Sequence, residues 1–78
     1  MHLEIITPEK KLYTGEVKSV QLPGSAGSFG VLKNHAPLIS SLKEGIVKIV
    51  DEQKQIHTIP IKGGVIEVLK NKIIVLAE

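Results

Sequence analysis

Residues 46–61 read IVKIVDEQKQIHTIPI. The first five are mostly β-branched, and β-branched side chains favour extended backbone. Four polar residues, 51–54, end this run, and extended character resumes at Ile56. Two apolar runs joined by a short polar segment predict a β-hairpin.

A second hairpin is expected downstream of the first. Two glycines at 63–64 interrupt the chain, after which apolar runs occupy 65–69 and 73–76. Residues 70–71, a lysine and an asparagine, lie between those runs. Asparagine tolerates the positive φ of a two-residue hairpin loop, so the sequence predicts a tight turn there.

Further strands are expected towards the N-terminus, where apolar and polar residues alternate over 3–7 and 17–22. Helical periodicity is hard to find, because the longest candidate, 38–50, is interrupted by two serines and by Gly45. Glycine and β-branched residues disfavour a helix interior, so we expect no long helix. Short strands separated by turn signals predict an all-β fold, namely an antiparallel β-sandwich or flattened barrel.

Length and composition set further limits. The chain has 78 residues, enough for one domain with a small core, and we expect a single domain over 1–78. Cysteine is absent, which excludes disulfides, thiolate metal sites and thiol nucleophiles. No apolar run approaches the roughly 18 to 20 residues that a membrane-spanning helix needs, and the N-terminus lacks the pattern of a signal peptide.

The charge pattern argues against nucleic-acid binding. The formal net charge is +2, all ten basic residues are lysines, and they are interleaved with eight acidic residues. Tyr13 and Phe29 are the only aromatic residues, and arginine is absent. Nucleic-acid interfaces usually combine a basic face with arginine and stacking aromatics, so this class of partner is not expected.

Residues 27–39, GSFGVLKNHAPLI, have the composition of an ordered loop. The two glycines permit backbone angles closed to other residues, whereas Pro37 fixes its own φ and biases Ala36 towards extended backbone. An ordered loop in so short a chain indicates contact with a partner. His35 projects from this turn, and two roles stay open for it, namely support of the turn through a hydrogen bond and contact with a partner.

Residues that could carry catalysis or bind a metal ion form no recognisable pattern. The three histidines are widely separated, without the spacing of a metal-ligand pair. A triad of Ser40, His35 and Asp51 is conceivable but lacks a nucleophile elbow. We therefore expect no catalytic, cofactor-binding or metal-binding residues. His57 is expected on the solvent face of its strand, and Phe29 is expected to belong to the core rather than to an exposed contact.

The run at 27–38 closely resembles the Gly-x-x-Gly-x-x-x-x-His-Ala-Pro-Leu signature of the epsilon subunit of F-type ATP synthases. Segments at 3–9, 12–17, 22–24 and 61–68 are similar to the same family in order and spacing. The resemblance covers essentially the whole chain, and it implies the family's N-terminal β-sandwich of about ten short strands.

The resemblance also implies a function. In that family the domain is a non-catalytic rotor subunit of the central stalk, without a cofactor. It links the gamma subunit to the polar loops of the c-ring, so that ion flow is coupled to ATP synthesis in the alpha/beta hexamer. This implies a peripheral location on the cytoplasmic face of a bacterial inner membrane. By position, the candidates for the gamma-facing surface are Thr7, His35, Leu38, Ser40 and Leu42. The candidates for the ring-facing loop are Ser25, Ala26, Gly27, Ser28 and Phe29.

Two departures from the family pattern lead to further expectations. The ring-facing loop often carries an acidic residue in the family, whereas residues 25–28 are neutral here. Hydrogen bonds and apolar burial would then replace charge attraction. The family usually continues beyond the position of Glu78 into a two-helix C-terminal domain that can inhibit ATP hydrolysis, and we expect this chain to lack that domain and its nucleotide site.

A biotinyl or lipoyl carrier domain is the alternative of a different class. Such domains are also all-β and of similar length, and their modified lysine sits at a hairpin tip. Lys70 has that place in the sequence, but the tripeptide 69–71, Leu-Lys-Asn, differs from those that the modifying enzymes read.

Overall fold

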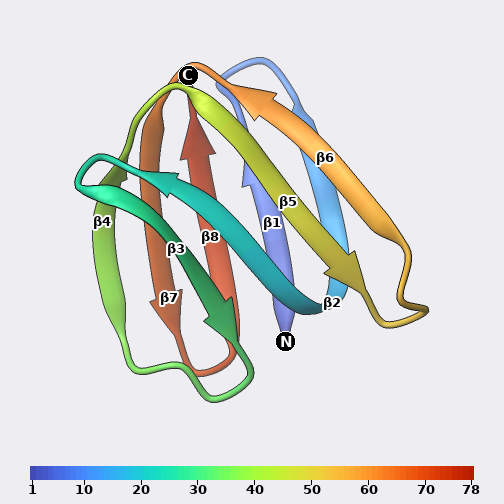
Figure 1. Cartoon of the computed structure of the whole chain (residues 1–78). Helices are drawn as coiled ribbons and strands as arrows, with labels where there is room; N and C mark the ends of the chain where they lie inside the picture. The colour runs from blue at the N-terminus through green and yellow to red at the C-terminus, as the bar shows by residue number, and fades with distance from the viewer.

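The computed structural model describes residues 1–78 and contains eight β-strands and no helix, hence no helical segment that could cross a membrane (Figure 1). The all-β prediction is confirmed. The expected number of about ten strands is wrong, because residues 11–24 form one strand of 14 residues rather than several short ones. The strands are β1 His2–Ile6, β2 Lys11–Gly24, β3 Gly27–Leu32, β4 Leu38–Leu42, β5 Gly45–Asp51, β6 Ile56–Ile61, β7 Gly64–Leu69 and β8 Lys72–Ala77.

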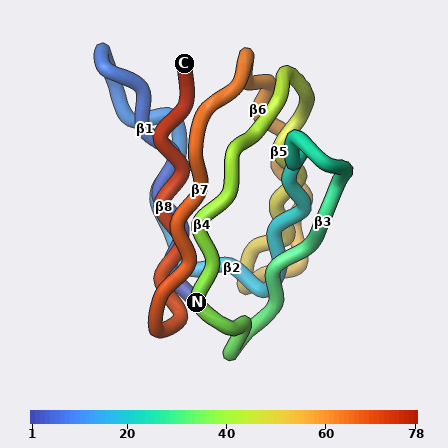
Figure 2. The backbone as a smooth tube through the Cα atoms, turned by 90° about the vertical axis from the view of Figure 1, so that its left-hand side faces the viewer, coloured from blue at the N-terminus to red at the C-terminus, as the bar shows by residue number.

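The strands lie in two layers, which Figure 2 shows from the side. One layer contains β1, β8, β7 and β4, and the other contains β3, β5 and β6. Strand β2 belongs to both, because its first half pairs with β1 and its second half with β3 and β5. A shift of register between Val17 and Ser19 lies where β2 passes from one layer to the other, and such irregularities bend a strand. All pairings are antiparallel except that of β1 with β8.

Both predicted hairpins are confirmed. Strands β5 and β6 pair in register from Gly45 opposite Ile61 to Val50 opposite Ile56. Strands β7 and β8 are joined by Lys70 and Asn71, which have φ angles of 51° and 60°. Positive φ at both central residues is the requirement of a type I′ turn, whose twist matches that of the flanking strands.

The core lies between the two layers and contains only apolar side chains. Alternate residues of each strand point inwards, as the burial pattern of β8 illustrates. No polar or charged residue is buried. The 15 buried side chains form one cluster between the layers, and dense packing of this kind makes an interior hard to compress. The core consists of Leu3, Ile5, Val17, Val20, Leu22, Val31, Leu42, Val47, Ile49, Ile61, Ile66, Val68, Ile73, Val75 and Ala77.

Candidate docking surfaces

The β2–β3 turn and the first two residues of β3 present four of the five residues expected in the ring-facing loop. Residues 25–28 are exposed, whereas Phe29 is half-buried and packs against the core. The turn is tied to β4, because the Ser25 backbone N–H donates to the Ser41 carbonyl at 3.1 Å. The Ser41 hydroxyl also donates to the Ser25 hydroxyl at 2.9 Å. The turn is therefore an ordered, neutral surface with hydroxyl groups on it.

The loop between β3 and β4 carries His35 in a defined conformation. The His35 backbone N–H donates to the Leu32 carbonyl at 3.1 Å, and Asn34 between them has a φ of 65°. His35 Nδ1 lies 2.7 Å from the Ala36 carbonyl oxygen, and since a carbonyl only accepts, Nδ1 carries the proton. The ring therefore supports its own turn, and Nε2 has no hydrogen-bond partner within the chain.

On β4 the three residues expected to face gamma point inwards, and the residues between them point outwards. Leu38, Ser40 and Leu42 share the inward side of the strand, whereas Ile39 and Ser41 point outwards. Leu42 is 5% exposed and belongs to the core, which corrects the expectation that it lies on a surface. Leu38 packs partly against the core. Because the period of a strand is two residues, the exposed apolar side chain is the neighbour, Ile39, at 73%.

Thr7 lies at the other end of the sandwich from His35. Strand β1 is parallel to β8, so it begins beside Asn71 and ends beside Leu76. Thr7 follows β1 and therefore lies at the end of the sandwich away from Asn71. The Thr7 hydroxyl accepts from the backbone N–H of Lys10 at 3.1 Å and donates to the Lys10 carbonyl at 3.0 Å. This hydroxyl therefore closes the β1–β2 turn. The five gamma-facing candidates do not form one continuous patch.

The structure also shows exposed apolar side chains that are not among the predicted site residues. Val65 on β7 lies opposite Leu76 on β8, and Leu76 lies beside Ile6 on β1, so the three form a row across the outer side of this layer. Leu76 is 57% exposed and Val65 44%. The sequence signal was present, because apolar residues occupy consecutive positions in β7 and β8, which makes both faces of the layer apolar.

A shallow groove adjoins the loop of residues 33–37, which is called the His35 loop below. Residues 37–39 of the loop and β4 line one side of it, and residues 67–69 of β7 line the other. Ile39 and Leu69, which is 48% exposed, both border this groove. The loop that carries the sequence signature is thus continuous with an apolar surface.

A polar cluster at the β5–β6 hairpin corrects the expectation for His57. Its side chain is on the same side of the sheet as buried Ile49, which lies directly opposite. His57 Nε2 hydrogen-bonds to Asp51 Oδ2 at 2.8 Å, and its ring meets the Tyr13 ring edge-on at 5.5 Å. The pKa of Asp51 is lowered from its usual value, mainly by the hydrogen bond from His57. Desolvation, and then the Asp51 charge, raise the pKa of Tyr13.

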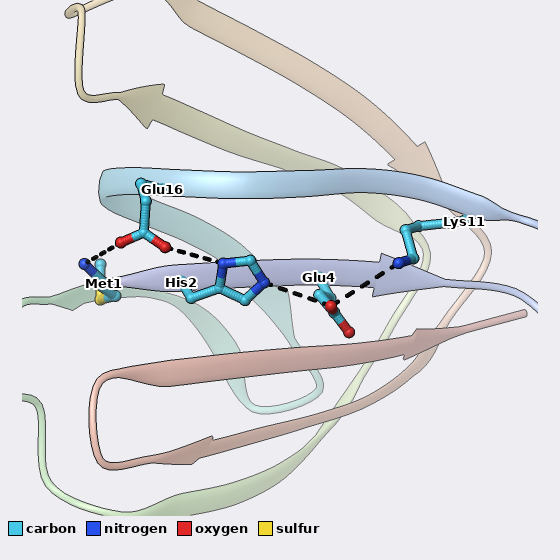
Figure 3. A network of polar contacts seen from close by, with 5 residues as sticks. All are labelled: Met1, His2, Glu4, Lys11 and Glu16. Carbon is cyan, nitrogen blue, oxygen red and sulfur yellow. Dashed lines mark hydrogen bonds and ion pairs between the residues drawn. The ribbon is translucent and has the colours of Figure 1, made fainter.

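A second polar network lies on the outer side of β1 and β2 (Figure 3). His2 contacts Glu16 through Nδ1 at 2.9 Å and Glu4 through Nε2 at 3.4 Å. The Met1 ammonium group lies 3.4 Å from Glu16 Oε1, and Lys11 Nζ lies 3.9 Å from Glu4 Oε2. The hydrogen bond from His2 is the main cause of a lowered pKa at Glu16. Most of these contacts join β1 or the adjacent Met1 to β2, whereas the His2–Glu4 contact lies within β1. No group of His, Asp and Glu in the chain has the arrangement of a metal site.

The three residues weighed as a triad are held in separate contacts. His35 bonds its own turn, Ser40 donates to the Ser41 carbonyl at 3.3 Å, and Asp51 bonds His57. Nucleophilic catalysis needs a serine and a histidine within hydrogen-bond reach. The structure therefore does not bring Ser40, His35 and Asp51 together.

Comparison with known protein families identifies the family of this chain. The family model of the β-sandwich domain of the ATP synthase delta/epsilon chain matches residues 1–78. The chain belongs to this family. Delta/epsilon-type relatives include the ATP synthase epsilon chains of Campylobacter concisus, 46% identical over 78 residues, and Campylobacter jejuni strain RM1221, 50% identical over 78 residues. All of this chain is covered in both alignments, and it spans 60% of the length of either relative.

Solved structures share the delta/epsilon sandwich fold at lower identity. A chain of the Euglena gracilis mitochondrial ATP synthase, solved as an OSCP/F1/c-ring assembly, matches with a TM-score of 0.90 and 19% identity. The match covers 96% of this chain and 48% of that one. A chain of the Tetrahymena thermophila central stalk and c-ring matches with a TM-score of 0.81 and 19% identity, covering 99% and 62%. At this identity the likeness concerns the fold.

The family match also argues against the alternative of a biotinyl or lipoyl carrier domain. Lys70 does lie at the tip of the β7–β8 hairpin, with a φ of 51°. That position alone favoured a carrier domain, whereas the whole chain matches the delta/epsilon sandwich. Lys70 is therefore interpreted as a residue of a type I′ turn.

Proposed function

We propose that this chain acts as the rotor sandwich of an ATP synthase epsilon subunit, a non-catalytic link between the gamma subunit and the c-ring. The observation that carries the proposal is the match of the delta/epsilon family model to all 78 residues. The geometry agrees with a mechanical part, since a purely apolar core joins two layers that present ordered turns at both ends.

The gamma-facing surface is proposed to comprise the His35 loop and the groove beside it. Exposed Ile39 and Leu69 supply apolar contact area at that groove, and the free Nε2 of His35 can accept a hydrogen bond. Apolar side chains bordered by polar groups are typical of protein interfaces. Half-buried Leu38 also lines this groove, whereas Ser40 would act from behind, by supporting β4.

The ring-facing surface is proposed to be residues 25–28, which form the β2–β3 turn and the start of β3. This segment carries no charge, and its two serines offer hydroxyl groups. Contacts of this kind are screened little by salt, whereas contacts between opposite charges weaken as ionic strength rises. We therefore expect binding to the c-ring that depends weakly on salt.

A rigid sandwich suits this role for a physical reason. Torque passes between two partners only if the connecting part deforms less than the partners move, and a densely packed core has low compressibility. If the link slipped, ion flow and ATP turnover in the alpha/beta hexamer would proceed independently. The proposed setting is therefore the membrane-bound ATP synthase, on the cytoplasmic face of a bacterial inner membrane.

Co-purification tests the proposal. The chain is tagged, isolated gently from its host and examined for gamma and the alpha/beta hexamer. Recovery of gamma is the expected result, and its absence under conditions that keep the hexamer intact would overturn the proposal. An intact mass without a biotinyl or lipoyl adduct on Lys70 is expected in the same preparation.

A pair of surface variants locates the gamma contact. Ile39→Asp places a charge beside the groove, and Ile56→Asp places one on the outer side of β6, where Ile56 is 61% exposed. Both positions are similarly exposed, so the stability cost is expected to be similar and small. Only Ile39→Asp is expected to weaken gamma binding, by at least about tenfold, as for an interface hot spot. Equal affinities for the two variants would place the contact elsewhere.

A further inference from the structure

Two asparagines tie the His35 loop to the β7–β8 turn. The Asn34 backbone N–H donates to Asn71 Oδ1 at 2.7 Å, and Asn71 Nδ2 donates to Asn34 Oδ1 at 3.0 Å. The residues are 37 positions apart in the sequence, yet their two turns lie side by side at the same end of the sandwich (Figure 1). The bonds are mutually consistent, because the backbone donor requires an oxygen at Oδ1 and so directs Nδ2 to the other amide.

Backbone conformation alone does not account for these two side chains. Asn34 and Asn71 have φ angles of 65° and 60°, which glycine adopts with less strain than asparagine. Glycine would therefore satisfy both turns but would remove the two hydrogen bonds between them. The amide pair is what asparagine adds at these positions.

The hydrogen bonds between Asn34 and Asn71 attach the His35 loop to another part of the chain. Apart from them, the hydrogen bonds of residues 33–37 are those from the His35 backbone to Leu32, at the end of β3, and from the His35 ring to Ala36. Both are local to the turn. Asn71, in contrast, is fixed in the frame of the molecule, because it lies between β7 and β8 and its carbonyl accepts from the His2 N–H at 2.9 Å.

We propose that Asn71 is a positioning residue, which holds the Lys33–Pro37 loop in the conformation that docks on gamma. This inference rests on the proposed function. Without the amide pair the loop would sample conformations that do not fit the partner, and the observed affinity falls in proportion to the fraction of chains that are competent to bind. Asn71 would thus influence docking through Asn34 and His35 without contact with the partner.

The test compares two variants of one turn. Asn71→Gly keeps a residue suited to positive φ but removes both hydrogen bonds to Asn34. Lys70→Gly changes the neighbouring residue, whose φ is 51°, and leaves the amide pair intact. The affinity of each purified variant for purified gamma is measured by calorimetry, together with its midpoint of urea unfolding.

Asn71→Gly is expected to weaken gamma binding about five- to tenfold relative to Lys70→Gly at a similar unfolding midpoint. Asn34→Gly removes one bond of the two, so an intermediate loss is expected. Asn71→Asp keeps an acceptor for the Asn34 N–H, and rotation of the Asn34 amide lets its Nδ2 donate to the other carboxylate oxygen. Recovery of most of the affinity is therefore expected for this conservative variant.

Hydrogen exchange of the Asn34 amide provides a readout that does not need gamma. Exchange at this amide should be slow in the wild-type chain and in Lys70→Gly, and fast in Asn71→Gly. If wild-type chain fails to bind gamma, the proposed function is overturned. If it binds, but Asn71→Gly and Lys70→Gly bind equally well, the positioning role of Asn71 is overturned while the proposed function stands.

Discussion

The aromatic ring of Phe29 lies against Gly24, so that a Cβ on residue 24 would be 2.8 Å from two of its ring carbons. Phe29 reaches this position from β3, opposite Leu22 of β2, and it packs partly against the core. The contact explains why Phe29 is half-buried although it borders an exposed turn. It also links the proposed ring-facing turn to the packing of the sandwich.

Gly24→Ala is therefore expected to destabilise the fold. The added methyl group would also lie 2.5 Å from the Gly27 carbonyl oxygen, so both the ring and the turn would have to move. Overpacking of this kind costs about 1–3 kcal/mol in the free energy of unfolding, measured by urea denaturation. Gly30→Ala in β3 is the control, because its methyl group would meet only the Val20 carbonyl, at 3.8 Å. Equal losses in the two variants would contradict the prediction.

Alternation along β4 predicts opposite consequences at neighbouring positions. Leu42→Ala removes a side chain that is 5% exposed and leaves a cavity, so a loss of about 2–5 kcal/mol is expected. Ile39→Ala removes one that is 73% exposed and should change stability by less than about 0.5 kcal/mol. Urea unfolding of the two variants measures both values. Similar losses would mean that β4 has a different register.

Tyr13 is expected to ionise above its ordinary pKa of 10.0, because desolvation and the Asp51 charge both favour the neutral phenol. It is the only tyrosine, and tryptophan is absent, so tyrosinate absorbance reports this side chain alone. The raised pKa contributes stability that is present below the unfolded value and is lost as the pH rises through the folded value. In Asp51→Asn the titration midpoint should fall but stay above 10.0, since desolvation is the larger cause. A wild-type midpoint at or below that value would contradict the assignment.

Asp51 should titrate below its ordinary pKa of 3.8, mainly because of the hydrogen bond from His57. A lowered pKa contributes stability that is present above the unfolded value and is lost as the pH falls through the folded one. His57→Phe keeps an aromatic ring beside Tyr13 but removes the hydrogen bond. The Asp51 pKa, followed by NMR of its carboxyl carbon, should then rise, yet remain lowered by the backbone N–H groups of Gln55 and Gln53. An unchanged titration in this variant would exclude His57 as the main cause.

The local structure of this protein follows from signals between residues that are close in the chain. The β-branched run at 46–50, the polar break after it and Lys70-Asn71 between two apolar runs are local signals, and both hairpins follow them. The signature at 27–38 was sufficient to indicate the family, which the match over all 78 residues confirms. Strand propensity and turn chemistry act between near neighbours, so a linear reading recovers them.

Which side chains are available to a partner depends on how the strands pair and pack. Leu38, Ser40 and Leu42 are expected on a surface when they are carried over from the family by position, but a shift of one residue in a strand exchanges the two faces, and it is Ile39 that points outwards. The parallel pairing of β1 with β8 and the bond between Asn34 and Asn71 join distant segments. Such contacts depend on how the layers close around the core, which no local pattern specifies.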